Sequence, residues 1–483
     1  YLYRNKRTEA FKLEPYSSWT RTDCTFRFLF TRSVAWLNCN HEIGLKCRSL
    51  GKFPAVFLIN TVSAQCLTGN DNPPTMNAKS REGVTDSRFG FALDTLKKTV
   101  QIEPSDNIFY SPHSLHQALT LAYFGARGTT EESLRKALHI PIDLSKVDVQ
   151  RYYAFENSNN GSADYEYRSA NRLWISNARK VRECMLDLFG DQLEKTDFRT
   201  NPGAVRDHIN EWVSNMTKGH IRDLLSSDSV TEDTDLVLAN AVYFKGPWLS
   251  RFDVANSKKD LFYTSGSQHS MATFMRQEGN FNHVISEVLG AHVLELPYKG
   301  EQVSMFVLLP PFATARSMDD KQKSNERDGV RQLIERISTE AGSAELRDLL
   351  DSGIPPQQVE VILPRFEVEK ELPLGTLLHA IGAGELLMPN MANLRGFVED
   401  GETPLSLGDA VHRARIEVTE EGTTAAAATA LYTFRSGRPL QPAVFDANHP
   451  FVYLIYDKPM RTILFSGVFR TPNAPQNTAE NSA

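Results

Sequence analysis

A run of small, uncharged residues near the C-terminal end restricts the fold more than any other feature of this 483-residue chain. Residues 420–430 read EEGTTAAAATA, which by intrinsic propensity would begin a helix capped by Gly422 and Thr423. The preceding residues 411–418, VHRARIEV, follow the period of two that is typical of a strand. The run therefore lies between a predicted strand and a proline-containing segment that leads to a second apolar run.

Such a run is suited to changing from a loop into a strand. If it entered an existing sheet, Thr423, Ala425, Ala427, Thr429 and Leu431 would point to one face and the intervening residues to the other. None of these side chains would bury an unpaired charge, which is the main cost of adding a polar segment to a sheet.

Short motifs recur in order between about residue 86 and residue 470. They are NIFYSPHS at 107–114, GARGTT at 125–130, NAVYFKGPW at 240–248, LPY at 296–298, MFVLLP at 305–310, LPRF at 363–366, HPF at 449–451 and FSG at 465–467. In this order they resemble the serpin family, over most of the chain. The small-residue run resembles the proximal hinge of the reactive-centre loop of inhibitory serpins. The resemblance implies an α+β fold, with about nine helices around three β-sheets and an exposed reactive-centre loop.

The resemblance also assigns roles to individual residues, none of them catalytic. The loop hinge corresponds to Glu420, Glu421, Gly422, Thr423, Thr424, Ala425, Ala426, Ala427, Ala428 and Thr429. Ser111, Ser114, Asn240 and His412 match the shutter beneath the opening of the sheet, and Trp248 matches the breach at its top. A lone histidine in a strand is more often a satisfied core residue, but here the two interpretations coincide because the shutter is itself a packed, hydrogen-bonded site.

The implied mechanism is suicide inhibition, in which a serine protease cleaves the loop and is trapped covalently when the cleaved loop inserts into the sheet. Counting from Gly422 by the family's usual spacing places the specificity residue at Ser436, and a spacing one residue shorter places it at Arg435. We favour cleavage between Arg435 and Ser436, because a long cation suits the acidic pocket of a trypsin-like protease. Phe434 would instead suit a chymotrypsin-like enzyme, and Ser436 an elastase-like one.

The partner expected from the resemblance is therefore a serine protease, with the inhibitor a monomer. The segments TFRSGRP and FDANHPF are similar to those of arthropod haemolymph serpins that restrain protease cascades of immunity and melanisation. The alternative is a non-inhibitory serpin, a carrier or a chaperone, whose hinge usually has charged or bulky residues that this run lacks. An enzyme is the third alternative, and no GxSxG, HExxH, CxxC or nucleotide-binding glycine motif supports it. No cofactor or metal is expected.

Charge is distributed unevenly, which separates the N-terminal part from the rest. The chain has a formal charge of −6, but residues 1–52 carry a net charge of +6, which leaves −12 for residues 53–483. An acidic body argues against a nucleic-acid partner. Arg48 and Lys52 precede the apolar run FPAVFLI, and Val62-Ser63-Ala64 has the small residues of a signal-peptidase site. The run is too short to span a bilayer, so no membrane anchor is expected.

We therefore interpret residues 48–64 as a signal peptide of a secreted, extracellular protein; the alternative is an apolar part of an N-terminal extension. The expected organisation is an upstream segment at 1–47, the signal peptide, a linker at 65–85, the serpin domain at 86–470 and a disordered tail at 471–483.

N-terminal sequencing of secreted protein tests the expected cleavage site. The mature chain should start at Gln65, and a start well upstream would contradict the signal-peptide interpretation.

Secretion would allow both a disulfide bond and glycosylation. Of the five cysteines only Cys66 and Cys184 follow the expected cleavage site, and an oxidising compartment permits a bridge between them without the sequence requiring it. Sequons occur at Asn160 and Asn215, and the polar loop around Asn160 makes it the better candidate for glycosylation.

Helical patterns precede strand patterns along the chain, which favours α+β architecture. Helices are expected at 86–100, 114–124 and 131–138, and helix and loop signals continue to residue 225. Strands are expected at 236–244, 292–296, 304–309, 359–363, 413–418, 451–456 and 462–469. The charged segment 312–358 is expected to form one or two surface helices and a mobile loop.

Overall fold

The computed structural model divides the chain into two units, residues 1–57 and residues 58–483. It describes residues 26–29, 34–37, 66–67, 78–159, 165–265, 268–312, 329–388, 391–403, 405, 407–422 and 442–472. In the first unit, strands β1 (Phe26–Leu29) and β2 (Val34–Leu37) form an antiparallel pair.

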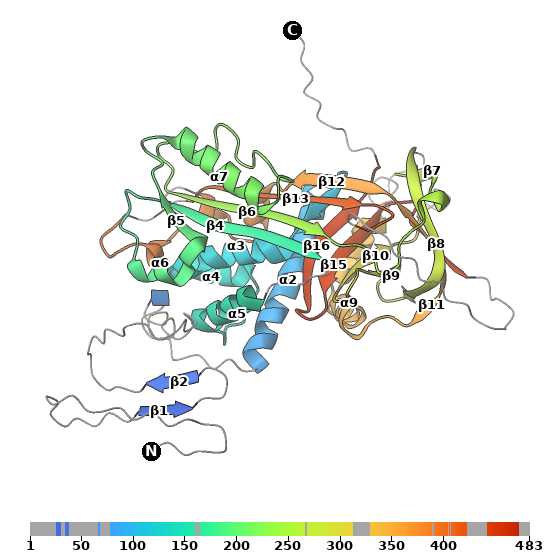
Figure 1. The fold of residues 1–483 in the computed structure, drawn as a ribbon, viewed down its shortest axis with the longest axis horizontal. Coiled ribbons are helices and arrows are strands. Elements are labelled where there is room, and N and C mark those ends of the chain that lie inside the picture. The colour runs from blue at the N-terminus through green and yellow to red at the C-terminus, as the bar shows by residue number, and fades with distance from the viewer. Residues whose placement is uncertain are drawn as a thin grey trace, which may run out of the picture. The chain divides into compact units, whose positions relative to one another are not determined.

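Two β-sheets organise the second unit (Figure 1). The five-stranded sheet has the order β12-β13-β6-β4-β5. Its strands are β4 (Glu166–Ser176), β5 (Leu193–Thr196), β6 (Leu236–Lys245), β12 (Phe366–Glu371) and β13 (Leu407–Val418).

The nine-stranded sheet has the order β14-β11-β8-β9-β10-β15-β16-β3, with β7 also paired to β8. Its strands are β3 (Ile108–Tyr110), β7 (Lys258–Tyr263), β8 (His269–Ser286), β9 (Ala291–Pro297), β10 (Val303–Leu309), β11 (Pro356–Pro364), β14 (Ala443–Asp446), β15 (Phe451–Asp457) and β16 (Thr462–Phe469). β10, β15 and β16 have no exposed residue, as expected for continuous apolar runs such as MFVLL and FVYLIY.

Nine α-helices lie in the part of the chain that the structure describes. They are α2 (Ala78–Ile102), α3 (Pro112–Gly125), α4 (Gly128–Ala137), α5 (Lys146–Asn159), α6 (Glu183–Phe189), α7 (Pro202–Met216), α8 (Gly329–Ile337), α9 (Glu340–Ser352) and α10 (Leu374–Ala380). Short 3-10 turns are η2 (Gly190–Gln192), η3 (Val254–Asn256), η4 (Gly384–Leu387) and η5 (Arg395–Phe397). None of the described helices is long and apolar enough to cross a membrane.

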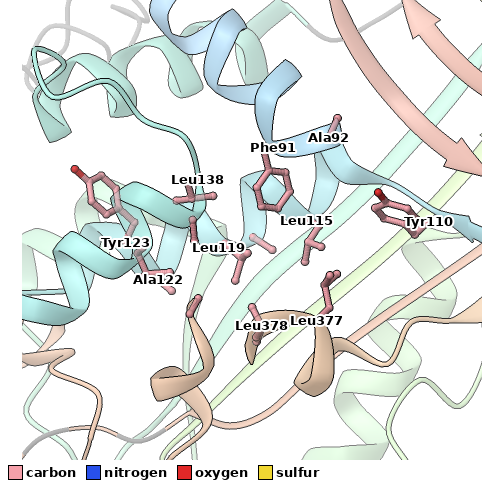
Figure 2. Packing of buried hydrophobic residues seen from close by; sticks show 14 of the residues in the cluster. Phe91, Ala92, Tyr110, Leu115, Leu119, Ala122, Tyr123, Leu138, Leu377 and Leu378 are labelled. Atoms are coloured by element: carbon pink, nitrogen blue, oxygen red, sulfur yellow. The ribbon is translucent and has the colours of Figure 1, made fainter. Parts of the chain in front are cut away.

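Helix α3 is the centre of the core, because every one of its residues is buried. Ser111 begins the helix by accepting a hydrogen bond from the Ser114 amide, and Pro112 occupies the first turn, where its missing N–H is not needed. Its apolar residues Leu115, Leu119 and Ala122 face side chains of α2 and α10 (Figure 2). The helix is thus enclosed on all sides, and its polar residues are buried together with its apolar ones.

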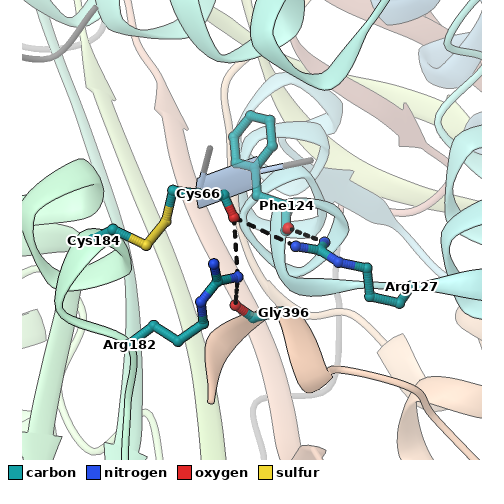
Figure 3. Close-up of a disulfide and its surroundings, with 6 residues drawn as sticks. All are labelled: Cys66, Phe124, Arg127, Arg182, Cys184 and Gly396. Carbon is teal, nitrogen blue, oxygen red and sulfur yellow. Dashed lines mark hydrogen bonds between the residues drawn. A yellow bond between two sulfur atoms is a disulfide. The ribbon is translucent and has the colours of Figure 1, made fainter. Parts of the chain in front are cut away.

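A disulfide joins Cys66 to Cys184 at the start of α6, across 118 residues of sequence (Figure 3). The main-chain oxygen of Cys66 accepts hydrogen bonds from Arg127 at 3.4 Å and from Arg182 at 3.2 Å. Cys66 and Leu67 are both buried in the main core cluster. The bridge that the sequence only permitted is thus present, and it fixes residues 66–67 to the body of the unit.

The α+β prediction is confirmed, and the expected strands from residue 236 onward all lie within observed strands. The segment 312–358 contributes two helices, α8 and α9, while residues 313–328 lie outside the described residues. The expectation of helices and loops up to residue 225 was wrong for β3, β4 and β5. β4 contains the partly buried Ser169 and the buried Asn171, which hydrogen-bond to α3, and these polar residues obscured the strand pattern.

Gly125 ends α3 where the backbone lies directly against Phe397 of η5. A Cβ atom at Gly125 would lie 2.0 Å from the Phe397 ring, which is fully buried. We expect Gly125→Ala to lower the free energy of unfolding by about 1–3 kcal/mol through overpacking. Gly375→Ala in α10 is the control: its nearest contact would be an ordinary 3.5 Å, so little loss is expected. Equal denaturant midpoints for the two variants would contradict this.

Candidate functional site

The seam between β6 and β13, in the middle of the five-stranded sheet, is the first part of the site. β13 pairs in parallel with β6, from Leu407 beside Leu236 to Arg415 beside Tyr243. The outer neighbours of these two strands, β12 and β4, pair antiparallel with them. Parallel pairing is slightly less stable per residue than antiparallel pairing. A strand running opposite to both β6 and β13 could therefore replace one parallel ladder with two antiparallel ladders.

A helix covers each face of the seam. On one face, α7 contributes Val205, Ile209 and Val213 to a cluster that includes Val237, Ala239, Ala241 and Val411 of the two seam strands. On the other face, α3 approaches β6 closely enough for the side chain of Asn240 to donate a hydrogen bond to the main-chain oxygen of Ser114 at 3.1 Å. Any strand added at the seam would lie between these two helices.

A row of polar side chains crosses the sheet at one level. His412 of β13 lies beside Asn240 of β6, which lies beside Asn171 of β4. The ring of His412 donates from Nδ1 to the amide oxygen of Asn240, and the amide nitrogen of Asn240 donates to the oxygen of Asn171. All three side chains are buried, so each hydrogen bond compensates for water that these groups have lost.

Residues at the start of helix α3, on one face of the sheet, complete this network. The Ser111 amide donates to Nε2 of His412 at 3.1 Å, and the Ser111 hydroxyl donates to the Leu464 oxygen at 2.6 Å. The Ser114 hydroxyl accepts from the Asn240 side chain at 2.6 Å and also bonds Ser169 at 2.7 Å. Strands β4, β6, β13 and β16 are thereby joined to the first turn of one helix.

The network requires His412 to be neutral. Its Nε2 accepts a hydrogen bond from a main-chain amide, so the ring proton must be on Nδ1. Burial lowers the pKa of His412 to about 3, because removal from solvent disfavours the charged form of the ring. Protonation would place a second N–H against the Ser111 amide and break the link between β13 and α3.

The second part of the site is a turn at the end of β13, where the small-residue run begins. Thr419 and Gly422 exchange main-chain hydrogen bonds of 3.1 Å in both directions, so the chain reverses here. Gly422 also forms an antiparallel bridge to Pro247, which follows β6. Gly422 is therefore paired, antiparallel, with the continuations of both seam strands.

Glycine is needed at this position for two reasons. Gly422 has φ of +112°, which side-chain-bearing residues rarely adopt. A Cβ atom would also lie 2.4 Å from the main-chain nitrogen of Trp248. The backbone of the turn is thus in direct contact with the segment after β6.

Trp248 and Glu420 hold the turn in place. The Trp248 indole donates to the Thr419 oxygen at 3.0 Å, and its ring stacks on Tyr298 with 4.6 Å between centroids. Glu420 is 5% exposed; it accepts from the Ser257 hydroxyl at 2.7 Å and lies 3.9 Å from the Arg365 guanidinium. The start of the run is a packed element of the sheet, although its sequence is hydrophilic.

The structure brings together the residues predicted for the shutter, and it places Trp248 at the loop base with Glu420, Glu421 and Gly422. The remaining hinge residues, Thr423, Thr424, Ala425, Ala426, Ala427, Ala428 and Thr429, lie outside the described residues, as do Arg435, Ser436 and Asn160. Asn215 is exposed in the last turn of α7, whereas Thr217 of the same sequon is buried and bonded to Val213.

Sequence reasoning missed three members of the polar network: Ser169, Asn171 and Gln117. Asn171 donates to Gln117 of α3 at 3.0 Å and to Ser169 at 3.0 Å. Polar residues at alternate positions of a segment ending in the apolar run LWI were the available signal. Among the residues that the structure describes, no group of three or more histidine, cysteine or acidic side chains is placed to hold a metal ion.

Comparisons with known proteins identify this architecture. The family model described as serpin (serine protease inhibitor) matches residues 87–472. Serine protease inhibitor 88Ea of Drosophila melanogaster is 37% identical over 401 residues, which covers 79% of this chain and 89% of that protein. Human antithrombin-III is 33% identical, covering 76% of this chain and 77% of that protein. The structure of Serpin48 from the insect Tenebrio molitor matches with a TM-score of 0.68 at 27% identity, covering 83% of this chain and all of that one.

The buried histidine of the seam predicts a pH dependence. The pKa of His412 is lowered in the folded chain, so the unfolded chain binds the proton more tightly. Its contribution to stability is complete above pH ~6.5 and is lost as the pH falls towards 3, by up to ~1.4 kcal/mol per pH unit. The buried His113 and His116 act in the same direction, because burial lowers the pKa of both.

The test compares how steeply the unfolding free energy falls with pH in the wild type and in a variant that lacks His412. His412→Asn should be less stable than the wild type at pH 7, and its unfolding free energy should fall less steeply between pH 6 and pH 4. Denaturant titrations at several pH values give both slopes. Parallel curves would show that His412 does not carry this proton linkage.

Proposed function

Because the chain belongs to the serpin family, we propose that it is a secreted inhibitor that traps a serine protease by inserting its cleaved loop between β6 and β13. In this proposal the chain is a target of proteases and not an enzyme. It acts as a monomer and needs no cofactor. The protease attacks the loop as a substrate, and the covalent acyl-enzyme is carried away from its original position before water can release it.

The pairing of Gly422 is the observation that carries the proposal. This residue already has an antiparallel partner on each side, Thr419 beyond β13 and Pro247 beyond β6. The following residues would continue in the same direction between two strands that are parallel to each other. Fourteen residues, from Gly422 to Arg435, would extend about 45 Å as a strand, which is enough to cross a domain of this size.

The side chains along the proposed path are compatible with insertion. Residues 423–429 contain only threonine and alanine, which would add little volume on either the α7 face or the α3 face of the sheet. The seam residues that they would separate are linked chiefly by main-chain bonds and by the pair His412 and Asn240. Insertion would replace these bonds with main-chain bonds on both edges of the new strand, so the inserted state is favoured once the loop is cut.

The target is inferred from the loop and from relatives. Arg435 preceding Ser436 favours a trypsin-like protease, and the Drosophila relative is named as a serine protease inhibitor. We place the protein outside the cell, because the Cys66–Cys184 bridge fits an oxidising compartment. The proposed targets are proteases of an immune or melanisation cascade.

The second candidate function is a carrier or chaperone without inhibitory activity. Structures similar in fold include uncleaved ovalbumin, with a TM-score of 0.66 at 25% identity.

Arg435 tests the proposed target class. The wild type should form a complex with trypsin that survives denaturing gel electrophoresis, and the released C-terminal peptide should begin at Ser436. Arg435→Ala should abolish this complex and leave thermal stability unchanged, since a loop side chain contributes little to folding. Ser436→Ala is the matched control and should still trap trypsin. A released peptide beginning at Gly437, or loss of trapping only in the Ser436 variant, would refute the assignment.

Thr423 separates an inhibitor from a carrier. Thr423→Arg should change the stability of the uncleaved protein by less than about 0.5 kcal/mol, because we expect this position to be exposed before cleavage. Insertion would then bury an unpaired guanidinium at a cost of several kcal/mol, which slows insertion and lets deacylation win.

The Thr423 variant should therefore be cut as a substrate, and its cleaved form should gain little thermal stability. Thr423→Val is the control, because it is similar in size and uncharged, and it should still trap the protease. If wild-type protein gains no thermal stability on cleavage, the carrier function is favoured. If Thr423→Arg traps protease at undiminished stoichiometry, insertion is not the trapping step.

A further inference from the structure

We propose that Cys184 is a site of thiol exchange, and that it accepts cationic or neutral small thiols in preference to anionic ones. A surface cavity of about 400 Å³ lies against this residue, lined by Arg182, Glu183, Cys184, Glu399 and Asp400. Neither the seam of the sheet nor the reactive loop takes part in this site, so the inference is independent of the proposed inhibitory function.

The two sulfur atoms of the bridge differ in access. Cys66 is 1% exposed and belongs to the main core cluster, whereas Cys184 is half-buried and lines the cavity. An incoming thiolate can therefore reach Sγ of Cys184 but not Sγ of Cys66. Exchange requires attack on a sulfur along the S–S axis, so access decides which residue forms the mixed disulfide.

Cys66 is the leaving group of this exchange and stays anchored while the bridge opens. Two guanidinium groups, those of Arg127 and Arg182, bind the main-chain oxygen of Cys66 (Figure 3). These hydrogen bonds hold the backbone of Cys66 in place, so Sγ of Cys66 remains shielded from the reagent after it leaves. In the exchange, the reagent thiolate bonds to Sγ of Cys184, the original S–S bond breaks, and its electron pair leaves on Sγ of Cys66, which then takes a proton from water.

The lining of the cavity selects among reagents by charge. Three carboxylates, Glu183, Glu399 and Asp400, face one guanidinium, Arg182. Excess negative charge attracts an ammonium-bearing thiol and repels a carboxylate-bearing one, and salt screens both effects. Cysteamine should thus react with the bridge faster than 2-mercaptoethanol, and 2-mercaptoethanol should react faster than thioglycolate.

Thiol exchange should weaken the attachment of residues 66–67 to the ends of α3, η5 and α6. Arg182 also donates to the Gly396 oxygen at 3.4 Å, and Arg127 donates to the Phe124 oxygen at 3.1 Å, so Cys66 connects the end of α3 with η5 and the start of α6. When the bridge opens, residues 66–67 are held only by hydrogen bonds and packing. We expect the melting temperature to fall by several degrees.

The test exposes the full-length protein to each thiol, quenches with N-ethylmaleimide and maps peptides by mass spectrometry. Rates are divided by those of the same thiol with a small uncharged disulfide. The expected product carries cysteamine on Cys184 and maleimide on Cys66, and cysteamine should be roughly fivefold faster than thioglycolate at low ionic strength. This ratio should approach one in 1 M salt.

A double variant, Glu399→Gln with Asp400→Asn, is the matched control for the selectivity. It removes two carboxylates and keeps both cysteines, so exchange should continue with a smaller difference between reagents. An adduct on Cys66 with maleimide on Cys184 would overturn the proposal. So would a bridge that resists all three thiols in the native protein, or a ratio of cysteamine to thioglycolate rates that the double variant leaves unchanged.

Discussion

The hydrogen bond between His412 and Asn240 is the interaction on which the behaviour of the central sheet depends. It joins the two seam strands at the level where helix α3 begins, and both partners are also bonded to that helix. Buried polar groups are costly when they are unpaired, so the network favours one register of β13 against β6 and opposes any partial opening. In the proposed mechanism, the seam would therefore be either closed with this pair intact or fully occupied by the inserted loop.

The two ends of the seam are stabilised by different contacts. At the end near the loop, a tight turn between Thr419 and Gly422 packs on Trp248, and these contacts involve few residues. At the other end, residues 180–182 pair with 397–399, next to the bridge between Cys66 and Cys184. Opening that starts at the turn would break a small number of bonds at a time. In the proposed mechanism, the loop would therefore enter from the end near the turn.

Much of this arrangement could be predicted from the sequence, because the relevant motifs are local. NIFYSPHS supplies a helix cap and two serines within eight residues, and NAVYFKGPW supplies Asn240 and Trp248 within nine. The polar residues of β4 could not be assigned, since Ser169 and Asn171 are explained only by a helix more than fifty residues away. For the same reason the sequence left the pairing of Cys66 with Cys184 open: the bridge depends on tertiary contacts with Arg127 and Arg182.

The packing around the seam is compatible with the small residues that follow Gly422, whereas β13 itself carries larger side chains. β13 needs side chains that anchor it, and Arg413 and Arg415 form ion pairs with Glu371 and Glu367 of β12. These pairs lie on the side away from β6, so an added strand would not disturb them. In the proposed inserted state, residues 423–429 would meet two edges whose side chains are already packed by α3 and α7, and threonine and alanine add little volume there. The composition of this part of the run is thus compatible with the packing of the closed sheet.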